Sequence, residues 1–272
     1  MIVGSAGSAG TATQFGYTSV YTIAYRTYKR LIGVRGIVRT LRVTTANTPS
    51  DDAVSFDHRH IDLENRDEVY VIGDVHGCFD ALEALLGTLD LGANDLAVFV
   101  GDLVRKGPES KAVLDRVRRS PRLLSVRGNN ERKLLEGEAS LSALDAVDYQ
   151  YLESLPTAIS WDGGLVVHGG LDPSRPLSGH SDDDVLTMRS PVGNGYDGPF
   201  WFDRYEGPPR VFFGHTVLAE PIEREWAVGL DTGCVYGGQL TAYDVRRGES
   251  VSVAGPGHVE RSSEKIVGAD RE

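Results

Sequence analysis

Five short apolar runs in the middle of the chain each lead into an aspartate, asparagine or histidine next to a glycine. The runs are residues 69–72, 96–100, 123–126, 165–167 and 211–213. The polar residues that follow them are Asp74 and His76, Asp102, Asn129, His168 and His215. Each one alone is typical of a cap on a strand or helix. Because carboxylate oxygen and imidazole nitrogen together suit manganese, iron and zinc, the five occurrences predict a shared metal site.

These residues need secondary structure that brings them to one place. The apolar runs are rich in β-branched residues, which predicts buried strands, and open α/β folds bind ligands beyond the carboxyl ends of such strands. Apolar residues from Phe79 to Leu89 recur at helical spacing, Pro108 suits the first turn of a second helix, and Glu131 begins a third. Two strand–helix–strand units with short loops predict parallel strands joined by right-handed crossovers.

The second half of the chain has a different pattern. From Leu165 onward it favours strands, with late strands expected at residues 240–245 and 250–253 and an acidic helix start at Asp182. Trp201 and Tyr205 come shortly before the last of the five apolar runs. They would either line the site or pack in the core, and the core is the commoner place for large aromatic residues.

Taken together, the motifs resemble those of the calcineurin-like metallophosphoesterases, and within them the PPP-type phosphatases. That group includes protein serine/threonine phosphatases and symmetrical diadenosine tetraphosphatases. The family pattern GDxHG, GDxVxRG, GNHE, HGG and GHT reads here GDVHG, GDLVRKG, GNNE, HGG and GHT, between residues 67 and 245. The block LDTGCVYGGQL at 230–240 looks more like the tetraphosphatase branch. The resemblance implies an α/β fold, a sandwich of two mixed β-sheets flanked by helices.

The resemblance also implies a role for each ligand candidate. Asp74 and His76 would hold one divalent metal ion, and Asp102 would bridge it to a second. The second ion would be held by Asn129, His168 and His215. Two nearby cations need a shared carboxylate to offset their repulsion, and together they turn a bridging water into a hydroxide that attacks phosphorus in line. Manganese is the expected metal, with iron, zinc, nickel and cobalt as alternatives.

Cationic side chains are needed for the other phosphate oxygens. Arg127 directly precedes GNNE and is the first candidate, because a guanidinium binds phosphate through two hydrogen bonds. Lys106 stands where the family usually has arginine and would act as a point charge. Arg189 is a third candidate, and a solvated surface arginine is the alternative for it.

One family residue is replaced. In GNHE the histidine is thought to protonate the leaving oxygen, and an aspartate orients it in protein phosphatases; here these positions are Asn130 and Arg105. An amide cannot act as a general acid, a role typically worth about 10²–10⁴-fold in rate. We therefore expect a preference for phosphoanhydrides or activated aryl phosphates over phosphoserine. His180 is an alternative acid.

The sequence thus predicts a binuclear-metal-dependent hydrolase of phosphoester or phosphoanhydride bonds, leaning to dinucleoside polyphosphates or activated phosphates. A serine/threonine phosphoprotein phosphatase is one alternative, and a catalytically weak protein that recognises phosphorylated ligands is another. The expected partner is a phosphorylated small molecule or phosphoprotein. The net charge is −11, but the first 50 residues carry +6 and the rest −17, which argues against nucleic-acid binding by the catalytic part.

At 272 residues, the chain suits one large domain with appendages. We expect a low-complexity basic extension and linker at 1–66, a catalytic domain at 67–256 and a polar tail at 257–272. The basic segment would either touch a membrane surface or reflect a start codon assigned too early. With only two cysteines, no apolar run of 18 residues and no ordinary signal peptide, the expected location is cytoplasmic.

Overall fold

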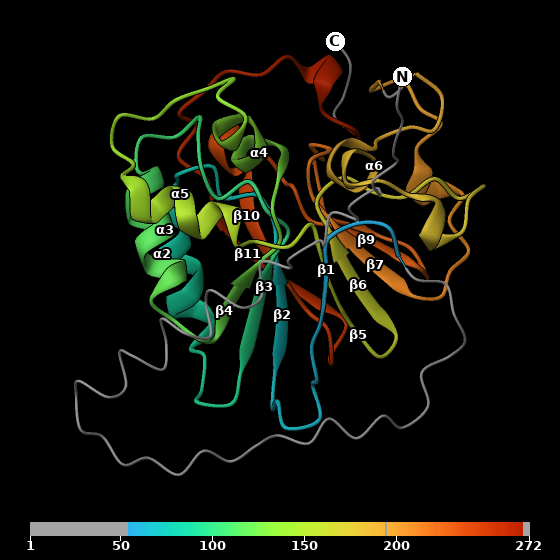
Figure 1. The fold of residues 1–272 in the computed structure, drawn as a ribbon, viewed down its shortest axis with the longest axis horizontal. Coiled ribbons are helices and arrows are strands. Elements are labelled where there is room, and N and C mark those ends of the chain that lie inside the picture. Colours follow the sequence, from blue (N-terminus) through green and yellow to red (C-terminus); the bar gives the residue numbers. More distant parts are fainter. Residues whose placement is uncertain (1–53, 194, 269–272) are drawn as a thin grey trace, which may run out of the picture. The chain divides into compact units, whose positions relative to one another are not determined.

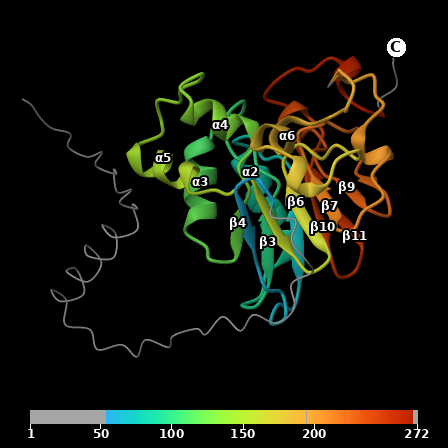
Figure 2. The ribbon, with the colours of Figure 1, turned by 45° about the vertical axis from the view of Figure 1, so that its right-hand side comes forward.

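The structure is a computed structural model that describes residues 54–193 and 195–268. Two β-sheets pack face to face, and four helices cover the outer face of one of them (Figure 1). These helices are α2 (Phe79–Leu89), α3 (Ser110–Arg118), α4 (Asn129–Leu135) and α5 (Ala146–Glu153). Seen from a second direction, α3 and α5 again lie outside the helix-covered sheet (Figure 2). The predicted sandwich of two mixed sheets with flanking helices is confirmed.

The helix-covered sheet, sheet B, contains the strands of the predicted strand–helix–strand units. Its order is β11-β10-β2-β3-β4, with β2, β3 and β4 parallel and β10 antiparallel to both neighbours. The strands are β2 (Val69–Ile72), β3 (Leu96–Phe99), β4 (Leu123–Ser125), β10 (Gln239–Asp244) and β11 (Glu249–Ala254). The parallel arrangement brings the carboxyl ends of β2, β3 and β4 to one edge.

The second sheet, sheet A, has the order β1-β5-β6-β7-β9-β8. Its strands are β1 (His58–His60), β5 (Ala158–Trp161), β6 (Gly164–Val167), β7 (Arg210–Phe213), β8 (Ile222–Glu223) and β9 (Ala227–Gly229). Strands β6, β7 and β9 run parallel. Within the described residues, the remaining helices are α6 (Asp182–Thr187) and four 3₁₀ turns, at Leu177–Gly179, Trp201–Asp203, Cys234–Tyr236 and Ser263–Lys265.

Alternation along the strands explains the layers. Val71, Val98, Val166 and Phe212 point into the space between the sheets, where all four are buried. Their neighbours in sequence pack outward, against α2 and α3 for sheet B and against a cluster that includes Trp201 for sheet A. Trp201 is fully buried, so the core position expected for it is the one observed.

The folded region extends beyond the limits of 67 and 256 predicted for the catalytic domain. The predicted linker contains β1, which pairs in parallel with β5, and Phe56 before it is buried. The predicted tail is tied back to the core, because Val267 accepts and donates backbone hydrogen bonds beside Leu218. These pairings join segments far apart in the chain, so local sequence did not reveal them. The predictions for residues 1–53 lie outside the described residues.

Helix α5 was not predicted. Only Asp148 and Leu152 of its residues are buried, so its apolar residues form no clear stripe, and the helix is begun by Asp145, which accepts hydrogen bonds from the next backbone amides. In the described part of the chain, no helix is both long and apolar enough to cross a membrane.

Candidate metal centre and active site

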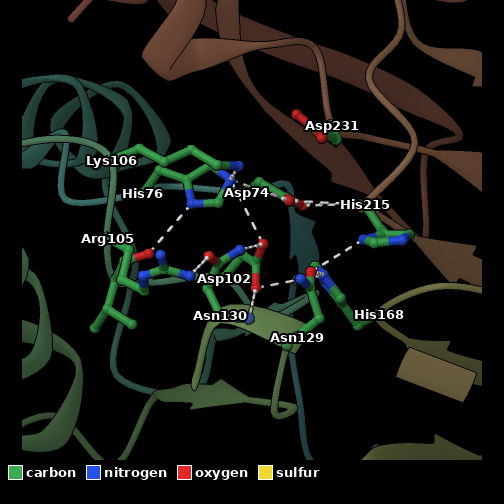
Figure 3. A network of polar contacts seen from close by, with 12 residues as sticks. Asp74, His76, Asp102, Arg105, Lys106, Asn129, Asn130, His168, His215 and Asp231 are labelled. Atoms are coloured by element: carbon green, nitrogen blue, oxygen red, sulfur yellow. Dashed lines mark hydrogen bonds and ion pairs between the residues drawn. The ribbon is translucent and has the colours of Figure 1, made fainter. Parts of the chain in front are cut away.

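The candidate metal ligands meet where the carboxyl ends of strands from both sheets come together (Figure 3). Asp74 and His76 follow β2, Asp102 follows β3, and Asn129 is the first residue of α4. The other sheet contributes His168 after β6 and His215 after β7. Three of them, at His76, Asp102 and His215, have φ values of 49°, 50° and 64°. This left-handed backbone is uncommon for residues other than glycine and tends to be found at functional sites.

The first ligand group consists of Asp74 and His76. Together with Asp102, these side chains offer ligand atoms that all lie within 4.8 Å of one another, and all three residues are buried. Asp102 faces two ways: one carboxylate oxygen is 3.5 Å from Nε2 of His76 and the other is 3.4 Å from Nε2 of His168. Its position between the groups is the one a shared carboxylate requires.

The second ligand group consists of Asn129, His168 and His215. The side-chain oxygen of Asn129 lies 3.0 Å from Nε2 of His168 and 3.0 Å from Nδ1 of His215. Two imidazole nitrogens and one amide oxygen therefore converge from both sheets on one small space.

Each of the three histidines is oriented by a backbone carbonyl. A carbonyl can only accept, so the ring nitrogen that faces it carries the proton, and the other nitrogen of a neutral ring keeps its lone pair toward the site. The donor–acceptor pairs are His76 Nδ1 to Val104 O at 3.2 Å, His168 Nδ1 to Val100 O at 2.8 Å and His215 Nε2 to Thr187 O at 3.1 Å. Such backbone contacts typically fix metal-binding histidines.

The charges in this space favour a cation. Burial lowers the pKa of His76 to about 3 and that of His215 well below its usual value, so both rings are neutral. Burial, and then the nearby Asp231 carboxylate, raise the pKa of Asp74. Although burial opposes charge on His168, the carboxylates of Asp102 and Asp74 raise its pKa to about 9. Buried carboxylates beside the neutral imidazoles of His76 and His215 fit divalent cations of the manganese–zinc type.

Glu131 and Asp231 are buried acids that the sequence prediction passed over. The carboxylate of Glu131 accepts backbone hydrogen bonds from Asp102 at 2.9 Å, Gly128 at 2.7 Å and Val104 at 3.2 Å. Glu131 therefore ties the loop after β3 to the start of α4. Its place three residues after Gly128 is the signal that could have shown this, because a glutamate at that helix position can accept the hydrogen bond of the N-cap amide, which is one half of a capping box.

A cavity of about 280 Å³ opens beside the ligand groups. Two predicted phosphate-binding residues, Lys106 and Arg189, line it. The Lys106 Nζ is 2.5 Å from Nε2 of His76, and an Arg189 terminal nitrogen is 3.4 Å from Nδ1 of His215. Lys106 thus lies beside the first ligand group, and Arg189 lies beside the second.

Arg127, the third predicted phosphate-binding residue, does not line this cavity. Its guanidinium donates a hydrogen bond to the carbonyl of Glu153 at 2.7 Å and lines a different hollow with Leu135 and Gln150. In this structure Arg127 therefore lies outside the cavity, and its expected role in binding phosphate stays a prediction. Nearness to Asn129 in sequence suggested it, but the side chain points away.

The replaced general-acid position is also in the site. The side-chain oxygen of Asn130 accepts from Arg105 at 2.6 Å, and its nitrogen donates to Asp102 at 2.5 Å. The amide links these two side chains, both of which line the cavity. The alternative acid, His180, is buried elsewhere: its Nε2 accepts from the Asp172 backbone amide and its Nδ1 faces the Pro176 carbonyl.

The cavity includes four further residues that the sequence did not identify, the apolar Val217 and the polar Lys133, Tyr236 and Arg261. Tyr236 lies in the LDTGCVYGGQL block, so the resemblance gave some signal for it. Arg261 lies in the segment expected to be a polar tail, and no motif marks it.

A core of two packed sheets with candidate metal ligands at its strand ends fits the class of metal-dependent phosphoesterases. Residues 68–253 match the calcineurin-like phosphoesterase family, and the chain belongs to that family. The predicted resemblance is thereby confirmed, and the protein is a phosphoesterase, a hydrolase.

The similar proteins are named either as tetraphosphatases or as protein phosphatases. The asymmetrical bis(5'-nucleosyl)-tetraphosphatase PrpE of Anoxybacillus flavithermus is 31% identical over 231 residues, covering 67% of this chain and 92% of the relative. Serine/threonine-protein phosphatase 1 of Salmonella typhimurium is 29% identical over 211 residues, covering 68% and 94%. A crystal structure provisionally described as a diadenosine tetraphosphatase is 33% identical, with a TM-score of 0.68, and covers 74% of this chain and 99% of that one.

Proposed function

We propose that the protein is a binuclear-metal-dependent hydrolase of phosphoanhydride bonds, acting on dinucleoside polyphosphates or similarly activated phosphates. The observation that carries the metal assignment is the orientation of His76, His168 and His215, each with one ring nitrogen on a backbone carbonyl and the other toward the site. The first ligand group would hold one ion, the second ligand group the other, and Asp102 both. When bound, two such ions, manganese first among them, supply Lewis acidity and acidify a shared water.

The chain itself supplies the contacts to the phosphoryl group. Lys106 and Arg189 stand at the two ligand groups and both line the cavity. Their positive charges would hold the oxygens of the phosphoryl group and orient it for attack from one side.

The leaving-group side supports an anhydride substrate. Asn130 occupies the general-acid position and its amide is engaged by Arg105 and Asp102, so it holds no proton to give to a leaving alkoxide. A nucleotide phosphate leaves without prior protonation far more readily than a serine alkoxide, because its terminal ionisation has a pKa of about 6. Arg105 would neutralise that leaving phosphate. The name of the PrpE relative agrees with this substrate class.

A substrate panel tests the proposal. With manganese, kcat/KM for diadenosine tetraphosphate is expected to exceed that for a phosphoserine peptide by about 100-fold or more, the size of a missing general acid. Equal values would replace the proposal by the protein-phosphatase reading, which the Salmonella relative favours. Failure to cleave either substrate or p-nitrophenyl phosphate, with metal bound, would leave a protein that only recognises phosphorylated ligands.

The two cysteines are free and buried, which fits a reducing cytoplasm as the place of action.

A further inference from the structure

Three cations and two tyrosines alternate in one continuous series along the cavity. The Lys106 Nζ lies 5.2 Å from the ring centre of Tyr236, and the Arg261 guanidinium lies 4.7 Å from the same ring. Arg261 is also 5.3 Å from the ring of Tyr196, whose ring centre is 5.0 Å from the Arg189 guanidinium. The ends of the series are the cations at the first and second ligand groups, so Arg261 is the central cation.

The segment that carries Arg261 is fixed on both sides. Before it, the Val259 amide donates to the Val235 carbonyl at 3.0 Å. After it, the Val267 amide donates to the Val217 carbonyl at 2.8 Å. Backbone hydrogen bonds therefore hold this stretch against the loops that follow β7 and β9, and the guanidinium is placed by the fold.

The guanidinium still has donors to offer. Its Nε donates to the Lys265 carbonyl at 2.9 Å, one terminal nitrogen to the Tyr236 hydroxyl at 3.1 Å and the other to the Tyr196 hydroxyl at 2.6 Å. A guanidinium has five N–H groups, so each terminal nitrogen keeps one. In the described ranges, Arg261 forms no ion pair with a carboxylate, and tyrosine rings support its charge without neutralising it.

The positive charge of the cavity exceeds what one phosphoryl group needs. Five described residues that line it are cationic: Arg105, Lys106, Lys133, Arg189 and Arg261. Lys106 and Arg261 each lie within about 5 Å of the same ring centre, so they are at most about 10 Å apart. A chain of a few phosphates that starts at the ligand groups is long enough to cover that distance and reach Arg261.

We propose that Arg261 is a specificity-determining residue that binds a phosphate beyond the one attacked, so that the cavity selects a chain of phosphates over a lone phosphoryl group. The assignment rests on the proposed function, which defines the attacked phosphate. The Arg261 guanidinium would donate its two remaining N–H groups to two oxygens of that phosphate.

The test is the binding of two non-hydrolysable probes to the manganese-loaded full chain, measured by calorimetry. Methylenediphosphonate carries two linked phosphonates and methylphosphonate carries one. Arg261→Met keeps apolar bulk between the tyrosine rings and removes the fork. We expect it to raise the Kd of methylenediphosphonate about 10- to 100-fold, the size of a lost charged hydrogen-bond pair, and that of methylphosphonate less than about 3-fold.

Arg210→Met is the matched control. Arg210 also lies over two aromatic rings, at 6.0 Å from Phe212 and 5.3 Å from Tyr243, but it pairs with Glu223 and does not line the cavity. This variant should bind both probes like the wild type. Arg261→Lys, which keeps the charge without the fork, should give an intermediate Kd for methylenediphosphonate and serves if Arg261→Met does not fold.

The outcomes separate the two proposals. If both probes weaken equally in the Arg261 variants, or neither weakens, the subsite assignment is overturned even when the wild type cleaves diadenosine tetraphosphate. If only methylenediphosphonate weakens but the wild type does not cleave the tetraphosphate, the subsite stands and the proposed substrate falls.

Discussion

Two clusters of charged side chains in this molecule use their cations in opposite ways. Between α3 and α5, the buried carboxylate of Asp148 meets Lys111 at 2.8 Å and Arg118 at 3.2 Å, and Asp115 meets both cations as well. We call this cluster the helix network. In the cavity, Lys106 and Arg261 form no carboxylate ion pair within the part of the chain that the structure describes. The cations of the helix network are thus held in ion pairs, whereas Lys106 and Arg261 are held mainly by aromatic rings and neutral groups.

The backbone shows the same contrast. The residues of the helix network lie on regular helices or at a cap, and Asp145 accepts the amides of Val147 and Asp148. In the site, Arg105 and Lys106 have φ values of 70° and 69°, in the left-handed region. Conformations of this kind cost of order 1–3 kcal/mol each and persist only where the surrounding structure enforces them. The site is therefore expected to reduce stability and the helix network to add to it.

The largest effect is expected from Asp102→Asn. Because its carboxylate faces both ligand groups, the variant should lose metal at both positions, and turnover of p-nitrophenyl phosphate should fall by at least about 100-fold. His76→Ala is the comparison, with loss mainly at one position. Metal analysis of the purified proteins measures both. An Asp102→Asn protein that keeps two metals and near-normal turnover would show that the bridging assignment is wrong.

Asp148→Asn tests the other cluster. The amide keeps the shape but removes the buried charge that Lys111 and Arg118 share, leaving Asp115 as their common carboxylate, so the free energy of unfolding should fall by about 2 kcal/mol. Turnover should stay within about 2-fold of the wild type, since the residue is remote from the cavity lining. Urea unfolding and a standard assay give the two numbers. A loss of turnover without a loss of stability would remove the distinction between the clusters.

Asn130→His should restore part of the missing acid. We expect kcat/KM for a phosphoserine peptide to rise about 10-fold, less than a full general acid contributes, because Arg105 stands where an orienting carboxylate is needed. Activity on diadenosine tetraphosphate should change less, since its leaving group does not need the proton. Comparable changes on both substrates would mean that residue 130 acts on binding or folding instead of proton transfer.

The smallest effect concerns a matched pair outside both clusters. The hydrogen bond from Arg175 lowers the pKa of Asp184 to about 2, and Asp184 also closes the capping box of α6. A carboxylate with a lowered folded-state pKa contributes stability above its unfolded pKa of about 4 and loses it as pH falls toward 2. Asp184→Asn should therefore lower the free energy of unfolding by about 1 kcal/mol at pH 7. In chemical unfolding at several pH values, this difference should shrink between pH 4 and pH 2; a constant difference would contradict the pairing.

What could be predicted from the sequence depended on how far apart along the chain the contacting residues lie. Asp74, Asp102 and His215 directly follow strands that their own apolar runs predict, so strand ends and ligands were found together. Arg127 also follows such a strand, but the direction of its side chain is decided by packing near Glu153, which the motif does not encode. Arg261 is held at the cavity by the pairings of Val259 with Val235 and of Val267 near Leu218, and no local sequence pattern predicts contacts of that kind.

The antiparallel pairing of β10 with β2 has a consequence for how the enzyme matures. Tyr70 lies opposite Asp244 in this pair, so the strand that precedes Asp74, which pairs with β3 on its other side, gains its second neighbour only after most of the chain has left the ribosome. Such long-range pairing gives a high contact order, and folding is slow when distant segments must meet first. Metal capture then follows the closing of sheet B, because a preformed set of ligands does not exist in the unfolded chain. Activity should therefore arise in a single late step of biosynthesis, once the last strands have docked.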